Sequence, residues 1–226
     1  MKKFELTGEF VTNIFGKKLF RIRALVAFGD VEAGELGGYV EKEDNLSDEG
    51  NAWVSGNAQV YGNAWVYGNA WVSGNAQVYG NAQVSGNARV YGDAWVYGDA
   101  QVYGNAWVSG DARVYGDAQV SGDARVYGNA QVYGNAQVYG NAQVYGDAWV
   151  SGDADILQIT GLGTVHRTTT VFRTTDGIRI ACGCFFGDLD AFREQVKNTR
   201  EGKVQREYLK FADLVEIYFG VDEEDE

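Results

Sequence analysis

A six-residue repeat fills the middle of the sequence and constrains its fold more than any other feature. From Gly50 to Ile156 the chain reads Gly-(Asn/Asp)-Ala-x-Val without insertion, with valine at every sixth position from Val54 to Val150. In each hexad Ala and Val point to one side of a short strand, and the Gly-(Asn/Asp) pair accepts the positive φ of a sharp turn. Such hexads are typical of left-handed β-helices, in which three hexads close one triangular coil. We therefore predict a mainly β protein with a single-stranded left-handed β-helix of about six coils over residues 50–156, with Ile156 as its last core residue.

Residues that are 18 apart are expected to stack on one face of this coil. On the face that we call the first face, the position before valine alternates between Trp and Arg, which predicts a column of cation–π contacts. Because Trp and Arg are enriched at interface hot spots, we expect this face to bind a protein partner or to pair in a homodimer. The alternative is that the column only holds the register of the stack. The predicted interaction residues are Trp53, Trp71, Arg89, Trp107 and Arg125.

The other two faces are expected to remain open to solvent. Stacked tyrosines and glutamines are common devices for holding strands in register, so these columns need no further role. The second face carries the ladder Tyr61, Tyr79, Tyr97, Tyr115 and Tyr133, and the third face carries Gln83, Gln101, Gln119 and Gln137.

Both ends of the chain lack the repeat and are expected to cap the solenoid, because open ends expose unpaired strand edges. Residues 1–49 predict an N-terminal β cap with a hairpin formed by Phe4–Ile14 and Leu19–Phe28. Residues 157–226 predict a small α+β C-terminal module that ends in an acidic tail, Asp222–Glu226, which we expect to be disordered.

The C-terminal module combines a hairpin with two helices. Thr164–Thr174 and Ile178–Cys182 are expected to pair around Asp176-Gly177, a common hairpin turn. Asp188 is expected to cap the first helix. The second helix has an amphipathic stripe at spacings of three and four residues, formed by Val204, Tyr208, Phe211, Val215 and Tyr218.

Polar and reactive side chains gather on this predicted hairpin. Arginines and threonine hydroxyls there could hold a small anionic ligand or a partner protein. Two cysteines and one histidine are too few for a four-ligand zinc site, and we expect no metal. A catalytic Cys–His pair is the alternative to structural thiols, and structural thiols are favoured. The candidate ligand-binding residues are His166, Arg167, Thr169, Arg173, Cys182 and Cys184.

Charge and composition exclude several classes of partner. The 226 residues carry a formal net charge of −12, and neutralising phosphates requires Lys and Arg, so neither nucleic acid nor an anionic membrane is expected. The N-terminus lacks the apolar stretch of a signal peptide, and no apolar run near it is long enough to span a bilayer. Two cysteines do not form a disulfide framework. We expect a cytoplasmic protein.

Three segments near the start, Ala33–Glu41, Asn45–Ser47 and Gly50–Val54, resemble the beginning of YdcK-type hexapeptide-repeat β-solenoid proteins of bacteria and phages. Near the end, Gly161–Gly163 with Arg167–Thr170 and Cys182–Phe185 resembles the tail of phage-borne members. The resemblance implies the fold and a phage or prophage origin, hence the host cytoplasm as location. It implies little about activity.

Enzymatic functions of related scaffolds need residues that the coils lack. Hexapeptide acyltransferases use a histidine base and extruded loops, and γ-type carbonic anhydrases use three histidines on zinc, whereas the chain has only His166. Ice-binding solenoids present threonine arrays, which the coils also lack. We therefore predict a non-enzymatic scaffold or binding protein without cofactor, with counter-defence as one setting. An acyltransferase-like enzyme and an acidic DNA mimic are the alternatives.

Overall fold

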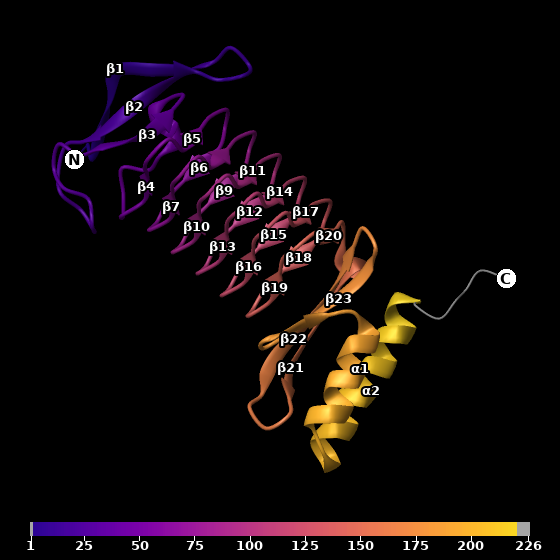
Figure 1. Ribbon diagram of the computed structural model, residues 1–226. Coiled ribbons are helices and arrows are strands. Elements are labelled where there is room, and N and C mark those ends of the chain that lie inside the picture. Colours follow the sequence, from indigo (N-terminus) through magenta and orange to yellow (C-terminus); the bar gives the residue numbers. More distant parts are fainter. Residues whose placement is uncertain (1, 221–226) are drawn as a thin grey trace.

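A solenoid of two-residue strands forms the centre of the molecule in a computed structural model, which describes residues 2–220 (Figure 1). Strands one coil apart pair in parallel and in register, so that Arg89 lies beside Trp107 and Val90 beside Val108. The predicted 18-residue coil and the solenoid of about six turns are confirmed. The left hand of the coil stays a prediction.

Three sheets, one for each predicted face, run along the solenoid. The first-face sheet contains β4 (Trp53–Val54), β7 (Trp71–Val72), β10 (Arg89–Val90), β13 (Trp107–Val108), β16 (Arg125–Val126) and β19 (Gln143–Val144). The second-face sheet contains β5 (Gln59–Val60), β8 (Gln77–Val78), β11 (Trp95–Val96), β14 (Arg113–Val114), β17 (Gln131–Val132) and β20 (Trp149–Val150). The third-face sheet contains β6 (Trp65–Val66), β9 (Gln83–Val84), β12 (Gln101–Val102), β15 (Gln119–Val120) and β18 (Gln137–Val138).

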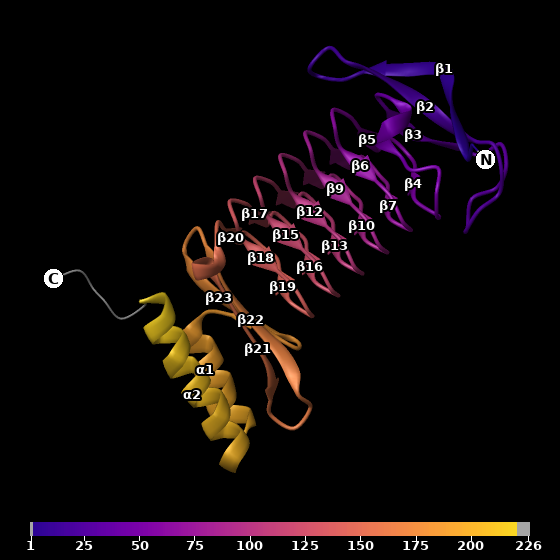
Figure 2. The same cartoon turned by 180° about the vertical axis from the view of Figure 1, so that it is seen from behind.

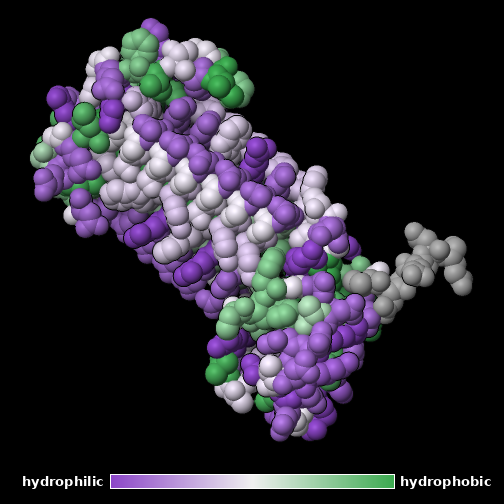
Figure 3. Space-filling view, in the orientation of Figure 1, coloured by the Kyte–Doolittle hydropathy of each residue, from purple (hydrophilic) through white to green (hydrophobic). Residues whose placement is uncertain are grey.

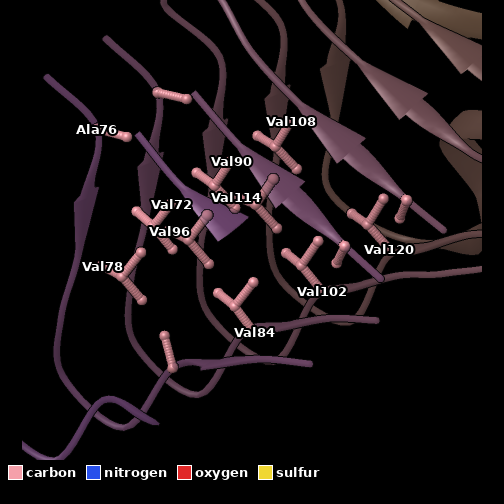
Figure 4. Packing of buried hydrophobic residues seen from close by; sticks show 14 of the residues in the cluster. Val72, Ala76, Val78, Val84, Val90, Val96, Val102, Val108, Val114 and Val120 are labelled. Atoms are coloured by element: carbon pink, nitrogen blue, oxygen red, sulfur yellow. The ribbon is translucent and has the colours of Figure 1, made fainter. Parts of the chain in front are cut away.

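The valines and alanines of the coils fill the interior of the prism (Figure 4). Ordering six residues costs about 6–12 kcal/mol, whereas burying one valine contributes about 1.5–3 kcal/mol. A single hexad therefore cannot fold alone, and the solenoid is stabilised by contacts between neighbouring coils. The corners stack equally closely. At Gly74, where φ is +70°, a Cβ would lie 2.9 Å from the backbone N and O of Gly92 in the next coil.

An N-terminal β cap extends the second-face sheet beyond the first coil. Strands β1 (Phe4–Thr12) and β2 (Lys18–Ala24) form the predicted antiparallel hairpin. Strand β3 (Leu36–Val40) pairs antiparallel with β2 and parallel with β5, and it thereby joins the cap to the coils. A 3₁₀ turn, η1 (Glu43–Asn45), precedes the first hexad.

A four-stranded antiparallel sheet closes the other end, and two helices cover its outer face (Figures 1 and 2). From its inner face Phe172 and Ala181 join the core of the solenoid, while Val171 and Ile180 pack with the helices. The Asp188 side chain accepts from the backbone N of Ala191 at 2.8 Å, as predicted for the helix cap. The elements are η2 (Asp153–Asp155), β21 (Ile156–Leu162), β22 (Arg167–Thr174), β23 (Gly177–Cys182), β24 (Phe185–Gly187), α1 (Leu189–Thr199) and α2 (Gly202–Phe219).

Three details of this end differ from the prediction. The strand expected over Thr164–Thr174 begins at Arg167, because residues 163–166 form the turn after β21. Ile156 does not continue the hexads: the chain turns through η2, and Ile156 begins β21, where it pairs with Phe172 and packs half-buried against the solenoid core. On α2 Phe219 is buried in place of Tyr218, which is 44 % exposed and donates its hydroxyl to the Asp153 carbonyl. The acidic tail Asp222–Glu226 lies outside the described residues. Within residues 2–220, no helix is both long and apolar enough to cross a membrane.

Candidate functional site

The Trp and Arg side chains of the first face stack mainly on each other. The Trp107 ring lies between the guanidinium groups of Arg89, 5.7 Å from the ring centroid, and Arg125, 4.9 Å away. Trp71 is half-buried and donates its indole N–H to the Ser55 hydroxyl at 3.1 Å. The predicted column is therefore continuous from Arg89 to Arg125, but Trp71 lies outside it. Each of these indoles already has a partner within the solenoid.

Trp53 is not an exposed member of this face, contrary to our expectation. Its side chain is fully buried beneath the N-terminal cap, where the Phe28 ring meets it edge-on at 5.4 Å. Gly37 makes room for the indole, because a Cβ there would lie 2.7 Å from Trp53 Cζ2. The cap covers Trp53 on this face and does not reach Trp107, so the same repeat position is buried at Trp53 and partly open at Trp107.

The predicted tyrosine ladder of the second face is formed, and it is partly covered. Its rings stack with centroids 4.9–5.0 Å apart. Tyr61 is buried, since Phe15 of the hairpin turn lies over Tyr61 and Tyr79. Burial raises the pKa of the Tyr61 hydroxyl well above its usual value. The ladder therefore holds both the coils and the cap.

Two of the candidate residues on the C-terminal hairpin, Arg173 and Thr169, hold the module together. Arg173 pairs with Asp155 at 3.2 Å and donates to the Phe219 carbonyl, so it links the last coil, the sheet and α2. Thr169 is buried and donates its hydroxyl to the Cys182 Sγ at 3.1 Å. His166 is exposed in the β21–β22 turn, with φ +48° and Nδ1 3.2 Å from the Gly161 carbonyl oxygen.

The other three candidates meet in a cleft between the sheet and the helices, which we call the C-terminal cleft. Arg167 begins β22, Cys182 ends β23, and Cys184 follows it on an exposed turn. The opposite wall comes from the end of α1 and the start of α2, and the cleft has a volume of about 640 Å³. Its principal lining groups are Arg167, Cys182, Cys184, Lys197, Arg200 and Tyr208.

The charges of the cleft set it apart from the rest of the module. Arg167, Lys197 and Arg200 line it, and within residues 2–220 none of them forms an ion pair. Glu201 is the one carboxylate among its lining residues. Three cations against one anion, on a chain with a net charge of −12, make a local site that attracts anions.

Tyr208 forms part of the floor and contributes a hydroxyl. The residue is buried, with its oxygen 3.4 Å from the Leu162 carbonyl. Burial first, and the neighbouring Cys182 second, raise the pKa of this hydroxyl. It is protonated at neutral pH and already donates to the Leu162 carbonyl oxygen, so toward a ligand this hydroxyl offers an acceptor.

The arginine and the two cysteines that the sheet side contributes to the cleft were predicted from the sequence, whereas the cations that the helices contribute were not. Lys197 and Arg200 lie in the polar run that ends α1, and such a run at a helix end is typical of a solvated surface. Only the fold brings it opposite Arg167. Among residues 2–220, no three His, Cys, Asp or Glu side chains come together as a metal site would require.

Apolar side chains on the surface gather at the two ends of the molecule and are scarce on the face of the solenoid that is visible in Figure 3. Figure 3 shows green, hydrophobic surface over the N-terminal cap and the C-terminal module, whereas the visible face of the solenoid is purple and white.

Comparison with known proteins identifies the repeat. Six segments match the YdcK β-solenoid repeat, at residues 58–74, 82–98, 100–116, 118–134, 130–146 and 136–152. A comparison with curated proteins gives no match. The matched segments lie within the stacked coils, and the coils have the parallel, in-register strands described above. The coils of this chain are therefore built from YdcK-type β-solenoid repeats.

Proposed function

We propose that the chain is a non-enzymatic binding protein in which the solenoid is a rigid support and the C-terminal cleft binds a small anionic molecule. The observation that carries the proposal is a set of three cations that form no ion pair within residues 2–220, Arg167, Lys197 and Arg200, on the walls of one cleft. Guanidinium groups bind carboxylates and phosphates through paired, charge-assisted hydrogen bonds.

The contacts between the C-terminal module and the solenoid support the proposal that the solenoid is a rigid support for the cleft. Phe172 extends the valine core into the sheet, and the Arg173–Asp155 ion pair ties the last coil to the module. The cleft is therefore attached to the end of a stiff rod through packed side chains.

The first face is the weaker candidate for the working surface. Trp53 is buried, Trp71 bonds Ser55, and Trp107 stacks between two arginines. These partners favour the interpretation that the column holds the stack in register. A protein partner or a homodimer through Arg89 and Arg125, both exposed, is the second candidate.

The enzymatic and DNA-mimic alternatives have less support. The hexads continue from Val54 to Val150 without an extruded loop or a histidine, and His166 lies outside the residues that line the C-terminal cleft. The aspartates of the coils share their corner columns with asparagines, and Asn75 donates to Asp93 at 3.0 Å, so they form corner ladders more readily than a phosphate-like row. We retain a phage protein acting in the host cytoplasm as the setting of the proposal.

The test is a binding titration with defined anions. Inorganic phosphate, citrate, decanoate and the nucleoside 5′-monophosphates are titrated by calorimetry and thermal shift. At least one is expected to bind, at least tenfold more weakly to Arg167→Ala/Arg200→Ala, which corresponds to about 1.4 kcal/mol. Arg206→Ala is the matched control, because Arg206 is an exposed cation outside the lining of the cleft. Equal binding by wild type and the double variant, or binding of none of these anions, would overturn the proposal.

A further inference from the structure

The floor of the C-terminal cleft is aromatic. Phe185 is half-buried and meets Phe192 edge-on, with ring centroids 5.3 Å apart, and Phe192 meets Tyr208 in the same way at 6.0 Å. Val196 and Val204 complete the apolar lining. Since Phe185 is the ring that remains partly open, a flat ligand group has one aromatic surface on which to stack.

The rim of the C-terminal cleft carries uncharged polar side chains and one carboxylate in addition to its three cations. Thr164, Gln195, Asn198 and Thr199 line the cleft together with Glu201, and all five are exposed. An acyl chain that covered these polar groups would displace the water molecules bound to them and would offer no hydrogen bonds in exchange. Such burial of polar groups is unfavourable. A ligand with several hydroxyl, amine and ring-nitrogen groups would satisfy them. The rim therefore disfavours a fatty acid.

Arg167 is placed to bind a phosphate. Its guanidinium lies over Gly183, between the two cysteines, where a Cβ would be 2.1 Å from Arg167 Nη1. Gly183 has φ +63°, a conformation that also favours glycine. Gly183 itself is not among the residues that line the cleft, so this contact places the Arg167 guanidinium at the edge of the cleft, opposite Lys197 and Arg200. Several cations around one space suit the doubly charged phosphate better than a single carboxylate.

We propose that the ligand of the C-terminal cleft is a nucleoside phosphate, with its base against Phe185, its sugar and base edges at the polar rim, and its phosphate at Arg167, Lys197 and Arg200. The inference rests on the proposed function and names its ligand class. A volume of about 640 Å³ lies within the range of small-molecule sites, about 300–1,000 Å³. Stacking of a base on an aromatic ring and pairing of its phosphate with arginine are the two interactions that such ligands use most.

The experiment separates the two halves of the ligand. Calorimetry compares the four nucleoside 5′-monophosphates with ribose 5-phosphate, the corresponding nucleosides and decanoate, all with the full-length chain. At least one nucleotide is expected to bind at least tenfold more tightly than its nucleoside, ribose 5-phosphate and decanoate.

Two variants give opposite expected patterns. Phe185→Leu should weaken binding of the nucleotide and of its nucleoside and leave ribose 5-phosphate unchanged. Arg167→Ala should weaken the nucleotide and ribose 5-phosphate and leave the nucleoside unchanged. Phe186→Leu is the control, since Phe186 is an exposed neighbour that packs on Tyr145 outside the cleft.

The outcomes also separate this inference from the proposed function. If decanoate, citrate or inorganic phosphate binds and no nucleotide binds more tightly, the nucleotide inference is overturned and the anion site stands. If no anion binds, both are overturned. If a nucleotide binds but Phe185→Leu has no effect, the stacking arrangement is wrong and the inference fails.

Discussion

The solenoid and the C-terminal module differ in how their polar side chains are satisfied. In the solenoid the outer side chains find partners in the next coil, as when Asn129 donates to Asp147, 18 residues further along, and Tyr115 donates to Gln131, 16 residues further along. The C-terminal module has no repeating unit that would supply such partners, and three cations at its cleft form no ion pair within the described residues. The polar side chains of a repeat therefore find partners in neighbouring coils. In an irregular module, charged side chains without a protein partner can remain available to a ligand.

The largest expected effect comes from a charge in the prism. Val102 is fully buried, and an unpaired carboxylate there would cost several kcal/mol. Val102→Asp should lose the cooperative melting transition measured by circular dichroism. The neighbouring exposed position is the control, so Gln101→Asp should stay folded. An unchanged melting curve for Val102→Asp would rule out the inward register of the valines.

Two tryptophans of the first coil differ in burial, and their truncation should separate them. Trp53→Ala is expected to lower the free energy of unfolding by about 3–5 kcal/mol, because it leaves a cavity under the cap. Trp65 is 42 % exposed and stacks on Tyr67, so Trp65→Ala should lower it by about 1 kcal/mol. Urea denaturation gives both values. Similar losses for the two variants would contradict the burial of Trp53 beneath the cap.

Corner glycines test how tightly the coils stack. Gly74→Ala combines a positive φ with a Cβ only 2.9 Å from the Gly92 backbone and should lower stability by about 1–3 kcal/mol. Gly152, after the last regular coil, has no heavy atom within 4 Å of an added Cβ and no positive φ. Gly152→Ala should therefore leave the urea midpoint nearly unchanged. Equal effects at the two positions would show that the corners are loosely packed.

A pH dependence of stability is expected at the N-terminal cap. Lys3 is buried and donates to the Ala52 carbonyl at 2.9 Å, and burial lowers its pKa from 10.5 to about 8, against the opposing effect of Asp48. Between these two values the unfolded chain binds the proton and the folded chain releases it, so folding becomes more favourable as pH rises. Relative to Lys3→Met, the wild type should gain stability from about pH 8 to pH 10.5. Parallel stability curves would show that Lys3 keeps its ordinary pKa.

The fold of the solenoid could be predicted well because the same six-residue pattern recurs in every coil. One valine every six residues specifies the inward face, and the 18-residue coil then places Arg89 beside Trp107, as observed. The prediction failed where the neighbours come from outside the repeat. Trp53 has the same local sequence as Trp107, and only Phe28 and Gly37 of the cap bury it.

The candidate site was predicted only in part. Arg167, Cys182 and Cys184 stood out because reactive residues are rare in this chain, and all three line the cleft. Lys197 and Arg200 belong to an ordinary polar helix end, so nothing local distinguishes them. Their role depends on the antiparallel packing of α1 and α2 over the sheet, which a single sequence does not specify.

The location of binding is the central claim, and one calorimetric comparison tests it most directly. The tightest-binding anion from the titration series is measured against two double variants, Trp71→Gln/Trp107→Gln on the first face and Arg167→Ala/Arg200→Ala in the C-terminal cleft. Glutamine already occupies the equivalent rung at Gln143, so the first-face variant should fold and bind with unchanged affinity. The cleft variant should lose at least tenfold. Loss of binding in the first-face variant, with binding kept in the cleft variant, would contradict the account.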